Sequence, residues 1–176
     1  DDTRTSFLGY PVIGNDDILP LYFKKGIKRV AMGLGGFTSN TLRKKVFNYA
    51  KGVGFEIITV IHPKAMVSRS AMVGEGSVLF AGAVLNTAAK VGSNCIIATG
   101  ATIDHESSVG DHSLISAGVT IGANVEIGAE TLCALGSKVI SGKKIGMNVL
   151  VAAGGVVVND IPAGQKVFGI PARPRT

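Results

Sequence analysis

A six-residue repeat runs from residue 67 to residue 157 and constrains the fold more than any other feature. Stepping forward six residues at a time from Val67, all sixteen positions are apolar. They are Val67, Val73, Leu79, Leu85, Val91, Ile97, Ile103, Val109, Ile115, Ile121, Ile127, Cys133, Val139, Ile145, Val151 and Val157. A helix repeats every 3.6 residues and a strand every two, so a period of six fits only a repeated unit of one short strand and one corner.

A slower repeat of eighteen residues lies on top of the first. Its glycines are Gly74, Gly92, Gly110, Gly128 and Gly146. Three six-residue sides close one triangular coil, so a glycine would stack at the same corner of every coil. Two residues before most of the apolar positions stands a small side chain, such as Ala83 or Ser113, which leaves room inside the corner. The sequence therefore predicts a mainly β protein, a parallel β-helix of about five coils.

Residues 1–61 follow a different pattern, with short apolar runs alternating with helix-forming segments. We expect strands within 9–14, 27–32 and 55–60, and helices from Asn15 to Lys25 and from Thr38, Ser39 or Asn40 to about Gly52. This order is typical of a small Rossmann-like α/β unit, here incomplete with three strands. We therefore expect two domains, residues 1–61 and 62–176. The Gly33–Gly36 loop between a strand and a helix start would contact substrate through Gly35 and Gly36.

Composition narrows the class of protein and of ligand. The net charge is +6, and Lys138, Lys143, Lys144, Lys166, Arg173 and Arg175 crowd the C-terminal end. A basic cluster at one end of a prism suits a small phosphorylated ligand, whereas the absence of interleaved aromatic residues argues against nucleic acid. No apolar run is long enough for a membrane helix, and no signal peptide is visible.

The cysteines are also informative. Cys95 and Cys133 fall on inward positions two coils apart, too far for a disulfide, so we expect free thiols and a reducing cytoplasm.

His105 is the strongest candidate for chemistry. It falls at an outward corner between Asp104 and Glu106, and a neighbouring carboxylate can fix the tautomer of an imidazole and stabilise its protonated form. His112, beside Asp111, lies one corner further on, about 15–20 Å away along one strand. The two histidines would meet only across an interface between chains.

The chain resembles the left-handed β-helix acyltransferases in its repeats and in three short segments. These segments are Ala101-Thr102-Ile103-Asp104-His105-Glu106, the junction Val60-Ile61-His62-Pro63 and the ending Gly169-Ile170-Pro171-Ala172-Arg173. More narrowly, the chain resembles the bacterial acetyltransferases that modify UDP-4-amino sugars or sialic acids. The resemblance implies a left-handed helix, acetyl-CoA as donor, no metal, and a cytoplasmic homotrimer with active sites between neighbouring subunits.

The resemblance also implies roles for particular residues. His105 matches the catalytic base and Glu106 the acid that orients it. The backbone amide of Ala123 matches the group that faces the acetyl oxygen, while Leu135 and Ala153 match positions that border CoA. Apart from the resemblance, the basic cluster of the C-terminal end leads us to expect that Lys143, Lys144 and Arg173 attract the phosphates of CoA.

The sequence departs from the family at the acceptor side. Many members carry a histidine where this chain has Leu114 and an asparagine where it has Ala98, which leaves the acceptor sugar open. Asp1 and Asp2 resemble an acidic pair that binds substrate. The strand and Gly-rich loop that precede this pair in the family are absent from the sequence, so we expect nucleotide sugar to bind more weakly than acetyl-CoA.

The function we expect is acetyl transfer from acetyl-CoA to the amine of a nucleotide-linked 4-amino sugar for surface glycans. Three alternatives stay open at this point. They are O-acetylation of a sialic-acid-like sugar, a zinc enzyme of the γ-carbonic anhydrase type, which needs three histidines, and a non-catalytic scaffold.

Overall fold

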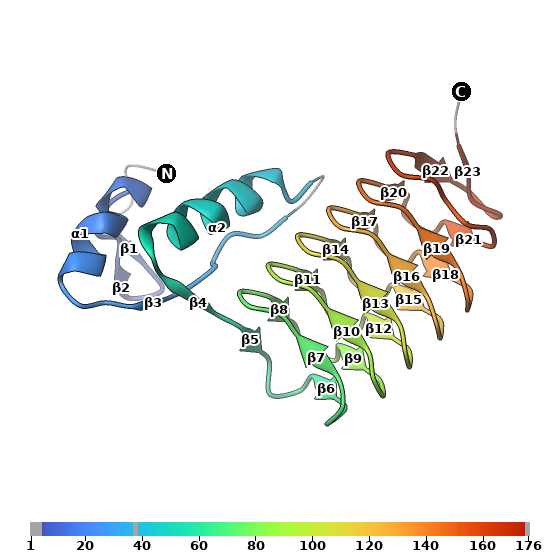
Figure 1. The fold of residues 1–176 in the computed structure, drawn as a ribbon, viewed down its shortest axis with the longest axis horizontal. Helices are drawn as coiled ribbons and strands as arrows, with labels where there is room; N and C mark the ends of the chain where they lie inside the picture. Colours follow the sequence, from blue (N-terminus) through green and yellow to red (C-terminus); the bar gives the residue numbers. More distant parts are fainter. Residues whose placement is uncertain (1–4, 37–38, 175–176) are drawn as a thin grey trace.

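The computed structural model describes residues 5–36 and 39–174. A parallel β-helix forms most of the molecule, and a small α/β unit lies against its first coils (Figure 1). The β-helix is a three-sided prism in which each side of each coil is a strand of two residues, with a longer strand at the end of one face. Strands eighteen residues apart pair in parallel, as β11 with β14, where Ile96 lies opposite Leu114.

The three faces of the prism are three sheets. Face 1 contains β5 (Val60–Ile61), β8 (Val78–Leu79), β11 (Ile96–Ile97), β14 (Leu114–Ile115), β17 (Leu132–Cys133), β20 (Leu150–Val151), β22 (Lys166–Phe168) and the antiparallel β23 (Arg173–Pro174). Face 2 contains β6 (Met66–Val67), β9 (Val84–Leu85), β12 (Thr102–Ile103), β15 (Thr120–Ile121), β18 (Lys138–Val139) and β21 (Val156–Val157). Face 3 contains β7 (Met72–Val73), β10 (Lys90–Val91), β13 (Ser108–Val109), β16 (Glu126–Ile127) and β19 (Lys144–Ile145). Because face 2 has six strands, the prism has about six turns rather than five.

The predicted six-residue positions form the core. Fourteen of them, from Leu79 to Val157, are buried, while Val67 and Val73 in the first coil are half-buried. Most of the small residues beside them are buried too. Backbone carbonyls accept from the hydroxyl groups of Ser77, Ser107, Ser113 and Thr131, whereas the buried Ser137 Oγ has no hydrogen-bond partner among the described residues. Ser113 Oγ, for example, donates to the carbonyl of Gly128 at 3.1 Å and accepts the Thr131 N–H at 3.1 Å. At Ser113, a small hydroxyl side chain therefore fits inside the prism with its donor and its acceptor both engaged.

The eighteen-residue glycines mark where successive coils come closest together. A Cβ atom added at Gly74 would lie 2.5 Å from the carbonyl carbon of Gly92, and one added at Gly110 would lie 2.5 Å from the nitrogen of Ala129. The glycines are therefore needed for the close approach of two backbones, as the eighteen-residue repeat predicts.

Every corner from residue 76 to residue 154, including those that hold the eighteen-residue glycines, turns through a left-handed residue at every sixth position. Besides glycines, this column holds Ala88, Asn94, Glu106, His112, Asn124, Glu130 and Asn148, all with φ between 54° and 60°. Asparagine tolerates this conformation well, whereas an alanine, glutamate or histidine adopts it at a cost of about 1 kcal/mol.

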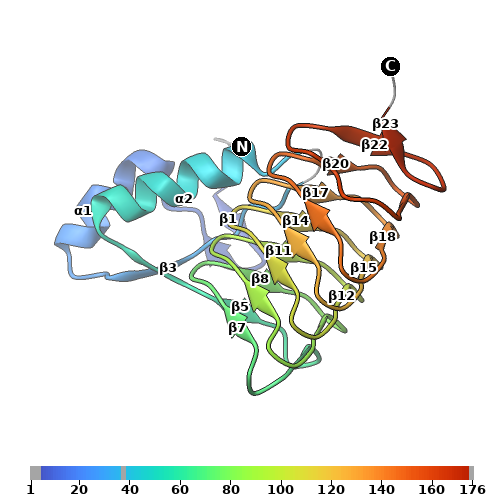
Figure 2. The same cartoon turned by 45° about the vertical axis from the view of Figure 1, so that its right-hand side comes forward.

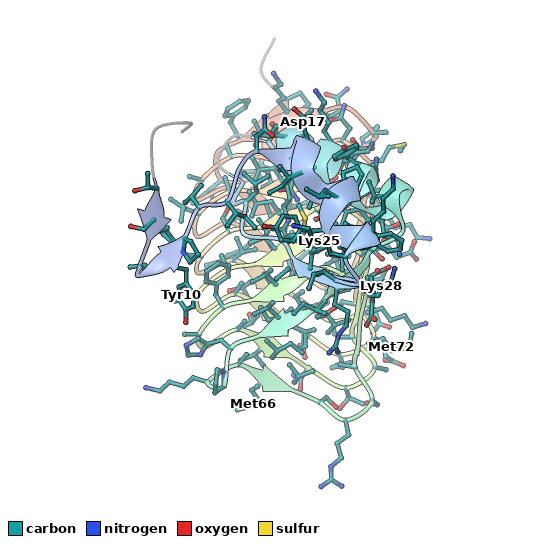
Figure 3. All side chains as sticks on the ribbon, turned by 90° about the vertical axis from the view of Figure 1, so that its left-hand side faces the viewer. Tyr10, Asp17, Lys25, Lys28, Met66 and Met72 are labelled. Carbon is teal, nitrogen blue, oxygen red and sulfur yellow. The ribbon has the colours of Figure 1, made fainter. Side chains whose placement is uncertain are left out.

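The α/β unit differs from the prediction in its strands. Ser6–Phe7 (β1) and Tyr10–Pro11 (β2) form a separate antiparallel hairpin, so the parallel sheet has two strands, β3 (Arg29–Ala31) and β4 (Glu56–Ile58), rather than three. The hairpin with Tyr10 extends away from the segment that carries Asp17 and Lys25 (Figure 3).

The helices begin and end close to their predicted limits. Asn15 caps the turn Asp16–Ile18 (η1) by accepting the Asp17 N–H, and α1 (Leu19–Lys24) follows. Helix α2 (Thr41–Val53) runs slightly past the expected end because Gly54 supplies the left-handed cap. It lies beside the edge of the prism between faces 3 and 1 (Figure 2). No helix of the described ranges 5–36 and 39–174 is long and apolar enough to cross a membrane.

Candidate active site

His105 and Glu106 lie together at the corner between β12 on face 2 and β13 on face 3. His105 Nδ1 is 3.2 Å from Glu106 Oε2, and the two side chains are 49% and 61% exposed. With Nδ1 donating to the carboxylate, Nε2 is the acceptor nitrogen of the ring. Glu106 has the left-handed φ of 58°, so this corner gives the base its partner at some cost in backbone strain.

Asp104 supports the same corner through the backbone. Its Oδ1 accepts the backbone N–H of His105 at 2.8 Å and the side-chain amide of Asn86, one coil earlier, also at 2.8 Å. These two hydrogen bonds, the first above all, hold the pKa of the Asp104 carboxyl below its usual value. Of the two acids that flank His105, Glu106 therefore pairs with the ring while Asp104 fixes the main chain.

Ala123 lies one coil beyond His105 at the same corner. Its side chain is buried, but its backbone amide is already engaged because the N–H donates to Ser141 Oγ at 3.1 Å. Ser141 lies one further coil along and is exposed. The amide expected to face the acetyl oxygen is thus capped by a serine hydroxyl in the isolated chain.

A groove of about 570 Å³ runs along face 1 and the corner that joins it to face 2, and it is mostly apolar. The predicted residues Gly35, Gly36, Leu135 and Ala153 line it. Ala98 and Leu114 line it as well, together with outward-facing residues of β11, β17 and β20. The two positions at which the sequence departs from its family are therefore walls of this groove.

Arg43 of α2 holds the loop that covers one end of the groove. The side chain is 1% exposed and donates to the carbonyls of Met32 at 3.2 Å and of Gly76, in the first coil, at 2.7 Å. It also donates to the carbonyl of Leu34, just before Gly35. Burial lowers the pKa of this guanidinium, although it remains a cation at any physiological pH.

The predicted site residues thus fall into two groups. His105, Glu106 and Ala123 lie at the corner between faces 2 and 3, whereas the groove lies on face 1. In a three-sided prism that corner is opposite face 1. One chain therefore does not bring the candidate base and the groove together.

The basic residues of the C-terminal end are spread over the three faces. Lys138 extends from face 2, Lys144 from face 3, and Lys166 and Arg173 from the end of face 1. Lys144 Nζ lies 3.1 Å from Glu126 Oε1, and Lys143 is half-buried at the corner before it. Arg175, Asp1 and Asp2 lie outside the described residues.

His112 joins the α/β unit to the prism. Its Nδ1 lies 3.0 Å from the Asn94 side-chain nitrogen, and the ring packs edge-on against Phe47 of α2 at 5.7 Å. Asn40 donates to the carbonyl of His112 at 3.0 Å. Desolvation above all, together with the charge of Lys44, lowers the pKa of His112 and favours the neutral ring. A neutral histidine that accepts from Asn94 fits a structural contact.

The two cysteines are free and buried, and burial raises the pKa of each thiol to about 12. Within residues 5–36 and 39–174, no group of three or more His, Cys, Asp or Glu side chains is arranged to hold a metal ion.

Comparison with solved structures identifies the family. A variant of GDP-perosamine N-acetyltransferase from Caulobacter crescentus, in complex with CoA and GDP-perosamine, is 35% identical and superposes with a TM-score of 0.94. The match covers 100% of this chain and 82% of that one. The acetyltransferase domain of PglB from Neisseria gonorrhoeae, in complex with acetyl coenzyme A, is 33% identical with a TM-score of 0.90, over 99% of this chain and 83% of that one. The chain belongs to the left-handed β-helix acyltransferases.

Within this acyltransferase family the chain falls among the CoA-dependent sugar N-acetyltransferases, as its sequence predicts. WeeI from Acinetobacter baumannii, at 22% identity and a TM-score of 0.58, shares the fold. No protein-family model and no curated protein matches the chain.

Sequence reasoning missed three supporting residues of this acyltransferase. Ser141 and Asn86 each lie one coil from a residue that it did select, so the eighteen-residue spacing already pointed to them. Arg43 gave no comparable indication, since a single arginine in a helix is normally on the surface.

Proposed function

We propose that this protein transfers the acetyl group of acetyl-CoA to the amine of a nucleotide-linked 4-amino sugar, with His105 as the general base. The His105–Glu106 pair supports this assignment most strongly, because it leaves Nε2 as an acceptor at an exposed corner. As the amine nitrogen attacks the thioester carbonyl, Nε2 takes one proton from it. The C–S bond then breaks, and the proton passes to the departing CoA thiolate. Glu106 stabilises the imidazolium that forms between these steps.

We further propose that a second copy of the chain completes the site. The base and the groove lie on opposite sides of one prism, so a neighbouring subunit must bring its His105 corner to the face 1 groove. Leu132 and Leu150, which point out of that face, are only half-buried in the isolated chain. Three prisms around a three-fold axis give every groove one such corner. Light scattering should then give about three chain masses, and a monomer at working concentration would contradict the proposal.

We assign acetyl-CoA to the groove because the lining of the groove is mostly apolar. Leu135 and Ala153 would contact the pantetheine arm of acetyl-CoA, while Lys143, Lys144 and Arg173 would attract its phosphates. Gly35 and Gly36, near the start of α2, would meet the acceptor. The match to enzymes that act on nucleotide-linked sugars supports this acceptor class. Two free thiols fit a reducing compartment, so we place the enzyme in the cytoplasm.

The test is release of free CoA thiol with a panel of nucleotide sugars. The panel pairs each 4-amino sugar with the analogue that carries a hydroxyl group at the same carbon. We expect turnover with the amines and little with the hydroxyl analogues. Preference for a hydroxyl acceptor would make the protein an O-acetyltransferase, and acetyl-CoA binding without transfer to any acceptor would leave a scaffold.

A further inference from the structure

Ser141 occupies the backbone amide of Ala123, the group expected to face the acetyl oxygen beside the candidate base. His105, Ala123 and Ser141 are eighteen residues apart in turn, so they stack at one corner in three successive coils. The Ala123 N–H donates to Ser141 Oγ at 3.1 Å. An amide carries a single hydrogen, so this one is not free to donate to a substrate while Ser141 keeps its position.

The hydroxyl hydrogen of Ser141 is available to donate to a substrate. Among the hydrogen bonds of the described residues, Ser141 Oγ accepts one and donates none. A hydroxyl group that accepts a hydrogen bond becomes a stronger donor, because the first bond polarises the second. The exposed Ser141 therefore presents a polarised O–H at the corner that carries the candidate base.

Gly122 keeps the serine in this place. A Cβ atom added at Gly122 would lie 2.7 Å from both the nitrogen and the Oγ of Ser141. Such a contact would push Ser141, which lies in the next coil, out of its position beside Gly122. The bare backbone of Gly122 therefore allows Ser141 to reach the neighbouring amide of Ala123.

We infer that the hydroxyl group of Ser141, rather than the Ala123 amide directly, donates to the carbonyl oxygen of the thioester during acetyl transfer. When the amine attacks, negative charge develops on that oxygen and the Ser141 O–H stabilises it without giving up its proton. When the C–S bond breaks, the charge leaves with the thiolate. Ala123 acts through Ser141 by polarising it. This inference rests on the proposed function, and within it adds a catalytic residue.

Substitution of Ser141 by Ala tests the inference. Losing one oxyanion donor typically costs about 10²–10³ in turnover. Here the freed Ala123 N–H would replace part of the lost bond, so we expect kcat to fall by roughly 10- to 100-fold, with KM for acetyl-CoA within about twofold of the parent. Ser141→Thr, which keeps the hydroxyl group, should restore most of the turnover.

Ser70 offers a matched control at the same edge of the prism. Its Oγ accepts the Ala88 N–H at 3.0 Å and so joins two adjacent coils. Both residues come earlier in the chain than the corner that carries His105. Ser70→Ala removes the same kind of bond, so it should leave kcat unchanged while lowering the melting temperature about as much as Ser141→Ala does.

Three outcomes would overturn the inference. Unchanged or higher turnover in Ser141→Ala would mean that the serine merely caps the amide. A raised KM with normal kcat would mean that it holds the donor. An equal loss of kcat in Ser70→Ala would mean that the corner is simply unstable. If the parent enzyme transfers acetyl and His105→Ala does not, each of these results leaves the proposed function intact.

Discussion

Arg43→Met should loosen the α/β unit from the prism. The arginine donates to the carbonyls of Met32, Leu34 and Gly76, and its bonds to Met32 and Gly76 are buried. Methionine fills a similar space but offers no donor, so two carbonyl groups would lose their partner beyond the reach of water. Each buried carbonyl group without a hydrogen-bond partner lowers the free energy of unfolding by about 1–3 kcal/mol, which gives roughly 2–6 kcal/mol for the two groups. Leu34 is exposed, so water can replace the third bond.

Circular dichroism separates the two parts of the molecule for this test. All the helix of the described residues lies in 16–53, so the helical component of the spectrum, separated from the β component by fitting at each denaturant concentration, reports the α/β unit. In a denaturant titration, the helical transition of Arg43→Met should shift to lower concentration while the β transition moves little. Lys45→Met, on the same helix but exposed, is the control for loss of a positive charge. A shift no larger than that of the control would show that Arg43 does not anchor the unit.

Two further predictions concern stability. Gly110→Ala should destabilise the prism by about 1–3 kcal/mol in a denaturant titration, because its Cβ would press on Ala129, whereas Gly52→Ala in α2, with nothing within 4 Å, should be neutral or stabilising. His112 has a lower pKa in the folded protein than in the unfolded chain, so on acidification the unfolded chain is protonated first. The contribution of His112 to the free energy of unfolding is therefore fully present above the unfolded pKa of about 6.5 and is lost as pH falls toward the folded pKa. His112→Asn, which suits the left-handed corner, should flatten that dependence between about pH 7.5 and about pH 5.5, and an unchanged slope would assign it to other groups.

The prism was predictable because its physical rule is periodic. Each side chain that points inward recurs after six residues, and each close backbone approach after eighteen, so the positions of Ile103 and Gly110 followed from spacing alone. The predicted count of coils is too low because the sequence pattern places Val60–Ile61 in the α/β unit, whereas this segment pairs with β8 on face 1.

Less regular features escaped prediction. The hairpin at Ser6–Pro11 occurs once and is not part of any repeat. Nothing in the sequence therefore distinguished it from a strand of the parallel sheet. Arg43 finds its carbonyl partners in a loop and in the first coil, which only the folded chain brings together. For the candidate site, the sequence indicated His105, Glu106 and Ala123. That Ser141 occupies the Ala123 amide depends on a side-chain rotamer, which spacing does not specify.

The most direct test of the central claim is single-turnover acetyl transfer by His105→Ala beside the parent enzyme, with the acetylated sugar measured by mass spectrometry. General-base assistance is worth about 10²–10⁴ in rate, so the variant should lose a factor in that range while acetyl-CoA affinity and assembly stay the same. Glu106→Gln should lose less, because it keeps a hydrogen bond to Nδ1 but not the charge. Near-parental turnover in His105→Ala would place the base elsewhere and contradict the account.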